Sequence, residues 1–322
     1  IITVEQDQIL YLTLTNVGMM MRPDLFDTHS VHWHGFPHAG PVFDGVPETS
    51  PTPTMGASLT YYYEAAVAGT YFYHCHVEAA EHMQMGMIGN TWIYARQDRL
   101  GYGADPASTV AGRAGGPDTA PYGYVYNDGD GSTAYDVQYP LQLTAFDSEF
   151  HNASLGVAAL PFATMFDNYP MINGRGYPDT VSSADIVNQE GFVAQPAEQI
   201  IMRADGTTDT IINSGGIAAA SGDKILLRAS NVSTTHLYTI ATTLGVPMKV
   251  VGRDAALLKG PNDEDTSMTV NVLNIGGGQA FDVILDTTGV PAGTYFLYTT
   301  NLANLSNGPQ DRGGIMTEIN IN

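Results

Sequence analysis

Apolar and polar residues alternate in short runs along most of this chain. Clear runs lie at residues 9–16, 58–65, 69–73, 91–95, 224–230 and 281–286. Alternation with a period of two is typical of half-buried β-strands, and the Gly, Pro, Asn and Asp residues between the runs are typical of turns. No long stretch has a helical period of about 3.6 residues. The pattern therefore predicts an all-β protein built from β-sandwiches.

The strand pattern is interrupted at residues 98–138, which are rich in Gly, Pro and Asp. Such a composition is typical of a linker or a long surface connection. It separates two predicted domains, residues 1–97 and residues 139–322. The sequence Ala-Gly-Thr-Tyr-Phe at 68–72 recurs at 292–296. This internal repeat indicates that the two domains are distant copies of each other.

The histidines are concentrated in one part of the chain. Seven of the nine lie within residues 29–82, beside Cys75, which is the only cysteine. A thiolate, imidazoles and the thioether of Met87 form a donor set that suits copper, and Cys, two His and a weak axial Met make a blue-copper electron-transfer site. The stretch 74–87 therefore predicts a copper site, which a histidine from residues 29–34 would complete.

The spacing of these histidines predicts two faces. Residues i and i+2 of a strand point to the same side, so His32 and His34 share one face, as do His74 and His76. Cys75 then points to the opposite face. One strand can thus hold a metal through Cys75 and present the two neighbouring imidazoles to a second metal. Trp33 is expected to pack beside these loops.

Charge and hydropathy limit the remaining possibilities. The chain has 33 acidic and 12 basic residues and a formal net charge of −21, so few groups could neutralise nucleic-acid phosphates. No apolar run reaches the roughly 18 residues of a membrane span. The sequence begins at Ile1 within a strand pattern, and we expect that its natural N-terminus was processed or lies upstream. We expect an extracytoplasmic location: periplasmic, secreted or on the cell surface.

Several motifs resemble those of the multicopper oxidase family, which includes laccases and two-domain bacterial enzymes. They are SVHWHG, DGVP, GTYFYHCH and HxxxxM in the first half, and NGRGYPDT and VVGRDAALLKGP in the second. The resemblance covers nearly the whole chain. It implies two Greek-key cupredoxin β-sandwich domains, copper as the cofactor and an oxidoreductase activity. Copper nitrite reductases are also similar to this chain.

The resemblance implies a specific type 1 copper site. Its ligands would be His29, Cys75, His82 and Met87. Met83 and Met85 are rival candidates for the axial position. The second domain lacks nearly all of these ligands, because the repeat places His236 opposite His29 but Thr299 opposite Cys75.

The resemblance also implies a second copper site that is only half built. In the family, His32, His34, His74 and His76 would belong to an oxygen-reducing centre of type 2 and type 3 copper. That centre takes eight histidines from four His-x-His motifs, two of them from another domain, often in a neighbouring subunit of a trimer. Beyond the two clusters this sequence holds only His38, His151 and His236, which are expected to be surface or structural residues, and Thr300 stands where nitrite reductases have a histidine.

Two functions follow. The first is a copper oxidoreductase of the multicopper-oxidase type, which takes electrons from a small-molecule or protein donor at the type 1 copper. The electrons would pass through Cys75 to His74 or His76, and the acceptor would be oxygen or a nitrogen oxide. A homo-oligomer, with a trimer favoured, is expected. The alternative is a non-catalytic blue-copper protein outside the cytoplasm that carries electrons or binds copper.

Overall fold

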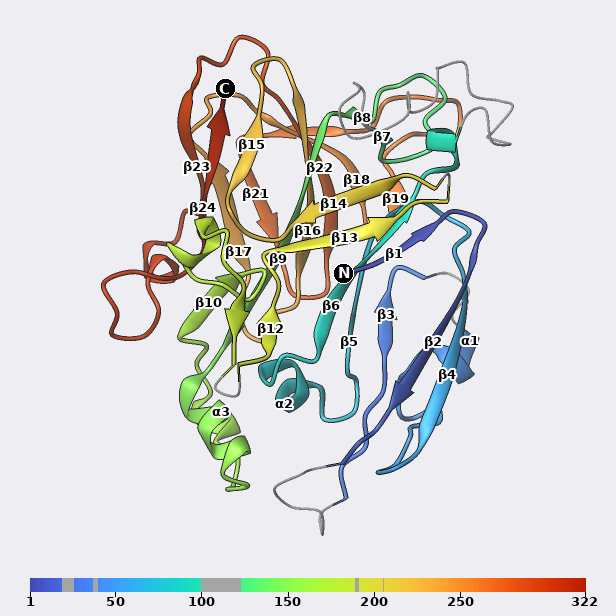
Figure 1. The fold of residues 1–322 in the computed structure, drawn as a ribbon, viewed down its shortest axis with the longest axis vertical. Coiled ribbons are helices and arrows are strands. Elements are labelled where there is room, and N and C mark those ends of the chain that lie inside the picture. Colours follow the sequence, from blue (N-terminus) through green and yellow to red (C-terminus); the bar gives the residue numbers. More distant parts are fainter. Residues whose placement is uncertain (19–25, 37–39, 100–122, 189–190, 205) are drawn as a thin grey trace.

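Strands form most of the protein, in two halves that pack against each other (Figure 1). The computed structural model describes residues 1–18, 26–36, 40–99, 123–188, 191–204 and 206–322. The all-β prediction is confirmed, since the helices in these ranges are short, and none is long and apolar enough to cross a membrane. His38 and the methionines at 19–21 lie outside the described residues.

The first half is a sandwich of two small sheets. One has the strand order β1 (Ile2–Glu5), β6 (Ile88–Tyr94), β5 (Gly69–His74), β3 (His32–His34), and the other pairs β2 (Ile9–Thr15) with β4 (Ser58–Glu64). Helices α1 (Gly40–Phe43) and α2 (Ala79–Gln84) and the 3-10 helix η1 (Arg96–Arg99) lie in the connections. The alternating leucines of β2 pack on Trp33, Tyr61 and Tyr63, as the period of two predicts.

The second half contains two larger sheets around one apolar core. The first sheet has the order β10 (Tyr169–Ile172), β9 (Val137–Phe146), β16 (Lys224–Asn231), β22 (Ala280–Asp286), β18 (Met248–Arg253), β19 (Ala256–Leu257), with β20 (Met268–Val270) also on β18. The second has the order β15 (Ile217–Ala219), β24 (Met316–Ile321), β23 (Gly293–Thr299), β17 (Tyr238–Thr242), β21 (Val272–Ile275).

Smaller elements surround these sheets. They are the strand pairs β11 (Ile186–Val187) with β12 (Val193–Gln195) and β13 (Glu198–Met202) with β14 (Thr208–Ile212), the helix α3 (Ser148–Leu155), and the 3-10 helices η2 (Phe162–Thr164), η3 (Asp179–Val181) and η4 (Leu302–Leu305). The carboxylate of Asp147 caps α3 by accepting from the backbone N–H groups of Glu149 and Phe150.

The connection predicted over residues 98–138 is only partly described, because residues 100–122 lie outside the described ranges. Where the chain is described again, it forms a hairpin of β7 (Gly123–Tyr124) and β8 (Ala134–Tyr135). Tyr126 and Tyr135 are buried there in an apolar cluster with residues of both halves. This part of the connection is therefore not an exposed linker, because its tyrosines pack between the two sandwiches. The division into domains stays a prediction.

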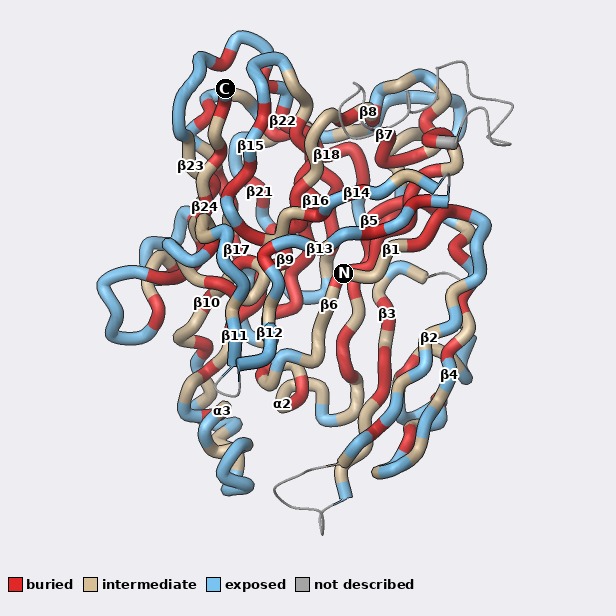
Figure 2. Tube along the Cα trace, in the orientation of Figure 1, coloured by how far each residue is buried: buried red, intermediate tan, exposed pale blue. Residues whose placement is uncertain are grey.

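The central strands are buried on both faces. In Figure 2, buried segments follow β5 in the first half and β16 and β22 in the second. The side of β5 that does not face β2 and β4 packs on the second half, so every residue of β5 except Tyr73 is buried. This arrangement fixes the end of β5, where the predicted ligands begin.

A buried ionic network ties β5 to the second half. Arg228 is fully buried, and its guanidinium donates to Thr70 Oγ1 over 3.2 Å and lies 3.8 Å from Asp282 Oδ1. Thr70 and Tyr126 both donate their hydroxyl groups to the Asp282 carboxylate, at 2.5 and 2.6 Å. A buried charge pair with these hydrogen bonds joins strands that are far apart in the sequence.

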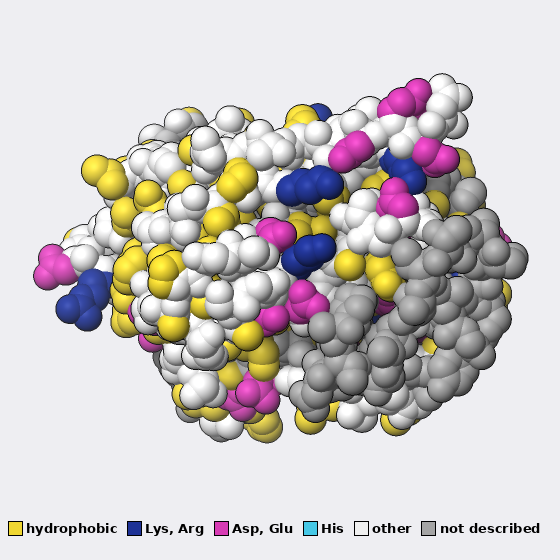
Figure 3. Space-filling model, turned by 90° about the horizontal axis from the view of Figure 1, so that it is seen from above, with side chains coloured by type: hydrophobic (Ala, Val, Ile, Leu, Met, Phe, Trp, Pro, Cys, Tyr) yellow, Lys and Arg dark blue, Asp and Glu magenta, His cyan; other side chains and the backbone are white. Residues whose placement is uncertain are grey.

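The net charge does not gather into one large patch on the face seen in Figure 3. Acidic and basic side chains are scattered there among neutral ones, in the part drawn in colour. The coloured part of that face therefore does not offer a single acidic surface for a cationic partner.

We expect Asp282→Ala to lower the free energy of unfolding by about 3–5 kcal/mol, because it leaves the Arg228 guanidinium buried without its counter-charge. Urea denaturation measures the change. Lys249→Ala is the matched control, since the Lys249–Asp265 pair (3.5 Å) is exposed and such a pair contributes about 1 kcal/mol or less. Equal losses in the two variants would contradict the role of the buried network.

Candidate metal centre

Three of the predicted ligands meet at the end of β5. Cys75 follows the last residue of this strand, and its Sγ lies 3.2 Å from Nδ1 of His82 and 4.0 Å from Nδ1 of His29. The two Nδ1 atoms are 3.3 Å apart. Cys75 is completely buried and His82 is 6% exposed, whereas His29 is partly exposed, so a sulfur and two imidazole nitrogens converge in a largely buried site.

The backbone holds these three residues in place. The N–H of Ser30 donates to Cys75 Sγ over 3.4 Å, which fixes the segment that carries His29. The N–H of Cys75 donates to the carbonyl of Met87, and the N–H of Met87 donates to the carbonyl of His82. These bonds close the loop between the two predicted ligands His82 and Met87.

The methionine candidates point to different environments. Met87 packs on the apolar cluster of Val31, Trp33, Tyr61 and Tyr63, next to Cys75. Met83 packs instead on the cluster of Phe72, Val232 and Ala280, and both Met83 and Met85 line a cavity on the other side of the loop. This difference favours Met87 as the axial donor. Trp33 lies beside the loops, as its position in the sequence indicates.

Asp27 is a residue that the sequence analysis missed. Its carboxylate oxygens lie 3.3 Å from Nε2 of His82 and 3.5 Å from Nε2 of His29. An acceptor at Nε2 keeps the proton on that nitrogen and leaves Nδ1 free to bind a metal, as outer carboxylates do for metal-bound histidines. The signal in the sequence was only an acidic residue two positions before the first histidine.

The surroundings of Cys75 favour its thiolate. Burial raises the pKa of this thiol, but hydrogen bonds with His29 and His82 and from the Ser30 amide outweigh burial and lower the pKa to about 6. Burial alone would lower the pKa of His82. The hydrogen bond with Cys75 and the charge of Cys75 outweigh burial, so the pKa of His82 is raised. A thiolate at neutral pH is the form that binds metals.

The second group of histidines lies on the other face of the same strand pair. β3 and β5 are antiparallel, with His32 directly opposite His74. Nε2 of His34 lies 3.0 Å from Nε2 of His74, and nitrogen atoms of His32, His34 and His74 all lie within 4.8 Å of one another. The centroid of the His76 ring lies 4.9 Å from that of His32 and 5.7 Å from that of His74. His76 is nevertheless not part of that closest group.

Backbone carbonyls orient three of these rings. Nδ1 of His74 bonds to its neighbour's carbonyl at Cys75 (2.7 Å), Nδ1 of His32 to Asp44 (2.6 Å), and Nδ1 of His34 to Gly278 (3.2 Å). The Nε2 atoms are therefore the ones left for a metal. Gly278 belongs to the second half of the chain, so the second half helps to orient a histidine of the first half. The positions of the histidines in the sequence did not predict this contact.

The DGVP motif places the carbonyl of Asp44. Gly45 has a φ of 76°, and a Cβ there would lie 2.1 Å from the carbonyl oxygen of Val31. Only glycine allows the backbone to approach the residue before His32 this closely.

Two histidines of the second cluster, His34 and His74, are expected to be uncharged at neutral pH. Burial, followed by the charge of neighbouring histidines, lowers the pKa of His34 and of His74 to about 4. Neutral imidazoles can offer their lone pairs to a metal without first losing a proton.

The remaining described histidines have other partners. Nδ1 of His236 lies 3.5 Å from the carboxylate of Asp167 and 2.7 Å from the hydroxyl of Thr235. His151 packs on the ring of Phe146. Among the described residues, neither belongs to a group of three that could hold a metal, so the structural roles predicted for them agree with their positions.

Comparison with known families gives one result for both halves. A family model described as multicopper oxidase matches residues 4–98, and another with the same description matches residues 156–318. Laccase-1 of Emericella nidulans is 37% identical over 98 residues, which are 30% of this chain and 14% of that protein. Multicopper oxidase MCE of Talaromyces pinophilus is 39% identical over 71 residues, 21% of this chain and 11% of that protein. The matches thus span a small part of these relatives.

Solved structures are similar over the whole chain. The blue copper oxidase from Nitrosomonas europaea has a TM-score of 0.66 and 21% identity, covering 99% of this chain and 75% of that chain. A copper nitrite reductase from the same organism has a TM-score of 0.58 and 13% identity, covering 100% of this chain and 82% of that chain. At these identities the likeness shows the fold alone, and the predicted cupredoxin class is confirmed.

In the metal-free protein, the thiolate absorbance of Cys75 should rise with a midpoint near pH 6, because its pKa is lowered to that value. His82→Gln removes a hydrogen-bond donor to the sulfur and should move the midpoint up toward the ordinary value of about 8.5. His151→Gln, far from the sulfur in the sequence and without contact to it, should leave the midpoint unchanged. An ordinary midpoint in the unaltered protein would show that the two imidazoles do not act on the thiol.

Proposed function

This chain belongs to the multicopper oxidase family, and we propose that it is an oxidoreductase that accepts electrons at a type 1 copper held by His29, Cys75, His82 and Met87. Copper is the cofactor of the family and of this chain. The observation that carries the proposal is the convergence of Cys75 Sγ with Nδ1 of His29 and His82. One thiolate and two imidazoles fit copper in its electron-transfer role.

Copper bound there supplies one-electron transfer between its two oxidation states. The residues of the chain do the rest. Cys75 offers a buried sulfur whose pKa of about 6 keeps it ionised, and Asp27 holds the Nε2 protons of both histidines. The hydrogen bonds that close the His82–Met87 loop keep the donors in place when no metal is bound, so little reorganisation is needed on binding.

We also propose that His32, His34, His74 and His76 hold a second copper. Cys75 is covalently adjacent to His74 and His76, so the shortest bonded path between the two sites crosses a single peptide unit. Oxygen or a nitrogen oxide would be the acceptor, and a small molecule or a protein the donor. A homo-oligomer, with a trimer favoured, and an extracytoplasmic location belong to the same proposal.

One observation favours a second function, that of a non-catalytic electron carrier. The sequence holds nine histidines, and outside residues 29–82 only His151 and His236 are left. These two cannot supply the two further His-x-His motifs that an oxygen-reducing centre takes. A carrier needs only the type 1 site.

Copper content separates the two functions. The oxidoreductase should bind two or more coppers per chain and consume oxygen or nitrite when a phenolic or metal donor is added. A carrier would bind one copper, show an intense blue colour and have no turnover. Elemental analysis with oxygen or nitrite uptake on the same copper-loaded sample decides between them.

Cys75→Ser should abolish the blue absorption, because the intense band arises from the copper–thiolate bond. His32→Gln with His34→Gln is the matched variant: it should keep the blue band and lose the second copper. A blue band that survives Cys75→Ser would show that the type 1 site lies elsewhere.

Asp27→Asn should raise the reduction potential of the blue copper by roughly tens of millivolts, because it removes a negative charge next to both imidazoles. Voltammetry of the copper-loaded protein measures the shift. Glu64→Gln, a charge change on β4 whose carboxylate accepts from the hydroxyl of Tyr62 (2.8 Å), serves as the comparison. Equal shifts in the two variants would assign the effect to net charge instead of the Asp27 contacts.

A further inference from the structure

A cavity of about 530 Å³ lies between the two halves, on the side of the His82–Met87 loop away from Cys75. The first half contributes Tyr73 at the end of β5, the loop residues 83–86 and the start of β6. The second half contributes β9, β10 and β12. Its volume is within the range of small-molecule sites, about 300–1,000 Å³.

The lining side chains are mostly uncharged. No lining side chain is a carboxylate, an ammonium or a guanidinium group, although the sequence has 33 acidic and 12 basic residues. Seven side-chain amides line it: Gln84, Asn90, Gln142, Asn173, Gln195, Gln199 and Asn213. The N-terminal ammonium of Ile1 and the imidazole of His151 also line the cavity, and the ammonium donates to Gln199 Oε1 over 3.0 Å. A charged ligand would lose its hydration and meet no carboxylate, lysine or arginine side chain, so the cavity favours neutral ligands.

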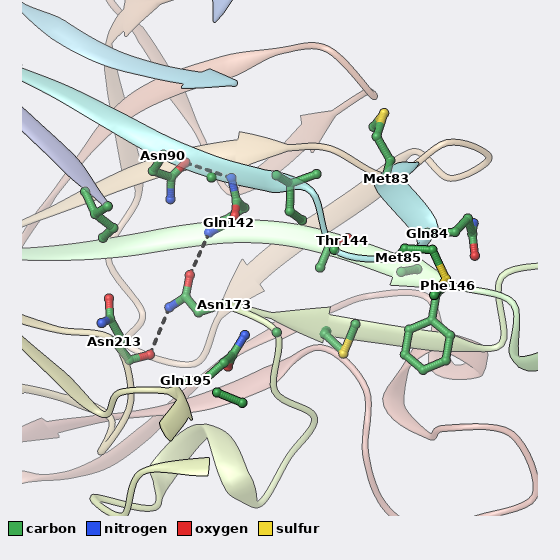
Figure 4. A pocket seen from close by; sticks show the side chains of 18 of the residues that line it. Met83, Gln84, Met85, Asn90, Gln142, Thr144, Phe146, Asn173, Gln195 and Asn213 are labelled. Atoms are coloured by element: carbon green, nitrogen blue, oxygen red, sulfur yellow. Dashed lines mark hydrogen bonds between the residues drawn. The ribbon is translucent and has the colours of Figure 1, made fainter. Parts of the chain in front are cut away.

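Asn90 directs an unpaired donor into this space. Asn90 is only 3% exposed. Its Oδ1 accepts hydrogen bonds from Gln142 Nε2 (3.0 Å) and Ser230 Oγ (2.8 Å). Its Nδ2 has no hydrogen-bond partner among the described residues. In Figure 4 that nitrogen points away from Gln142, toward the side where Asn173 and Asn213 lie. A ligand oxygen there would give this donor a hydrogen-bond partner.

Two further groups are available to a ligand. The hydroxyl of Thr144 and the side-chain amide of Gln195 line the cavity and have no protein hydrogen bond within the described ranges. Together with Asn90 they offer both donors and acceptors without charge. Hydroxyl groups, which donate and accept at once, match this set better than groups that do only one.

The other end of the cavity is more apolar. Figure 4 shows Met83, Met85 and Phe146 there, beside Gln84, with Thr144 between this end and the amides of Asn90, Gln142, Asn173, Gln195 and Asn213. Met171 also lines the cavity. A ligand that fits must therefore combine a hydroxyl-bearing edge with a hydrocarbon face. Sugar rings have both, because their hydroxyls lie around the edge and their C–H groups form a face that packs on aromatic and thioether groups.

We propose that this cavity binds a neutral saccharide. The site is formed by protein residues alone and does not depend on the function proposed for copper. It does share the loop: residues 83–86 lie between the proposed ligands His82 and Met87, and Gln84 anchors that loop by accepting from the Asp147 amide (2.6 Å) and donating to Asp167 (2.7 Å). A bound saccharide therefore contacts the loop beside the copper site.

Titration calorimetry on the copper-loaded full chain tests the proposal. The probes are the neutral disaccharides cellobiose and maltose, with cellobionate as the charged comparison. At least one neutral probe should bind saturably, and cellobionate should bind at least about tenfold more weakly than cellobiose. Thr144→Val and Gln195→Leu should each weaken binding about five- to tenfold, since each removes one hydrogen bond at nearly constant volume.

Asn152→Leu is the matched control, because it removes an exposed amide on α3 outside the cavity and should leave binding unchanged. Thermal unfolding of each variant confirms that it is folded. The proposal is overturned if neither neutral disaccharide binds, if cellobionate binds as well as cellobiose, or if the two cavity variants bind as tightly as Asn152→Leu.

Discussion

The antiparallel pairing of β3 with β5 is the constraint on which both histidine clusters depend. It places His32 opposite His74, so that the imidazoles of the two strands meet on one face, while Cys75 turns to the other and meets His29 and His82. β5 is in turn held by the buried Arg228–Asp282 network and by the apolar contacts of the second half. A fold that moved β5 by one residue would exchange the faces and separate both sets of donors.

The sequence predicts the metal-binding residues of this site better than the residues that surround and orient them. The alternation of β2, the His-x-His spacing and the lone Cys75 were enough to predict strands, faces and a copper-type donor set. Asp27, Gly278 and the amide-lined cavity could not be predicted, because each contact joins residues that are distant in the chain or differ from ordinary surface residues only by their position. The hairpin of β7 and β8 was hidden by its Gly- and Asp-rich composition, and its tyrosines become informative only when packed.

The two clusters are unequal in what they can do. The group around Cys75 has sulfur, two nitrogens and an outer carboxylate that fixes both rings, and so offers a metal a nearly complete environment. In the group of His32, His34, His74 and His76, carbonyls orient the first three rings, and no sulfur or carboxylate completes the closest set of His32, His34 and His74. An open position is what reaction at a metal needs, whereas electron transfer needs a closed one. In the function that we propose, the first group serves electron transfer and the second receives a substrate or a partner.

The most direct test of the account is the position of copper in crystals of the metal-loaded protein, found by anomalous diffraction at the copper edge. The account predicts one strong peak bounded by Cys75 Sγ and the Nδ1 atoms of His29 and His82, with Asp27 still in contact with both Nε2 atoms. Copper bound only among His32, His34 and His74, with the Cys75 thiol left free, would contradict it.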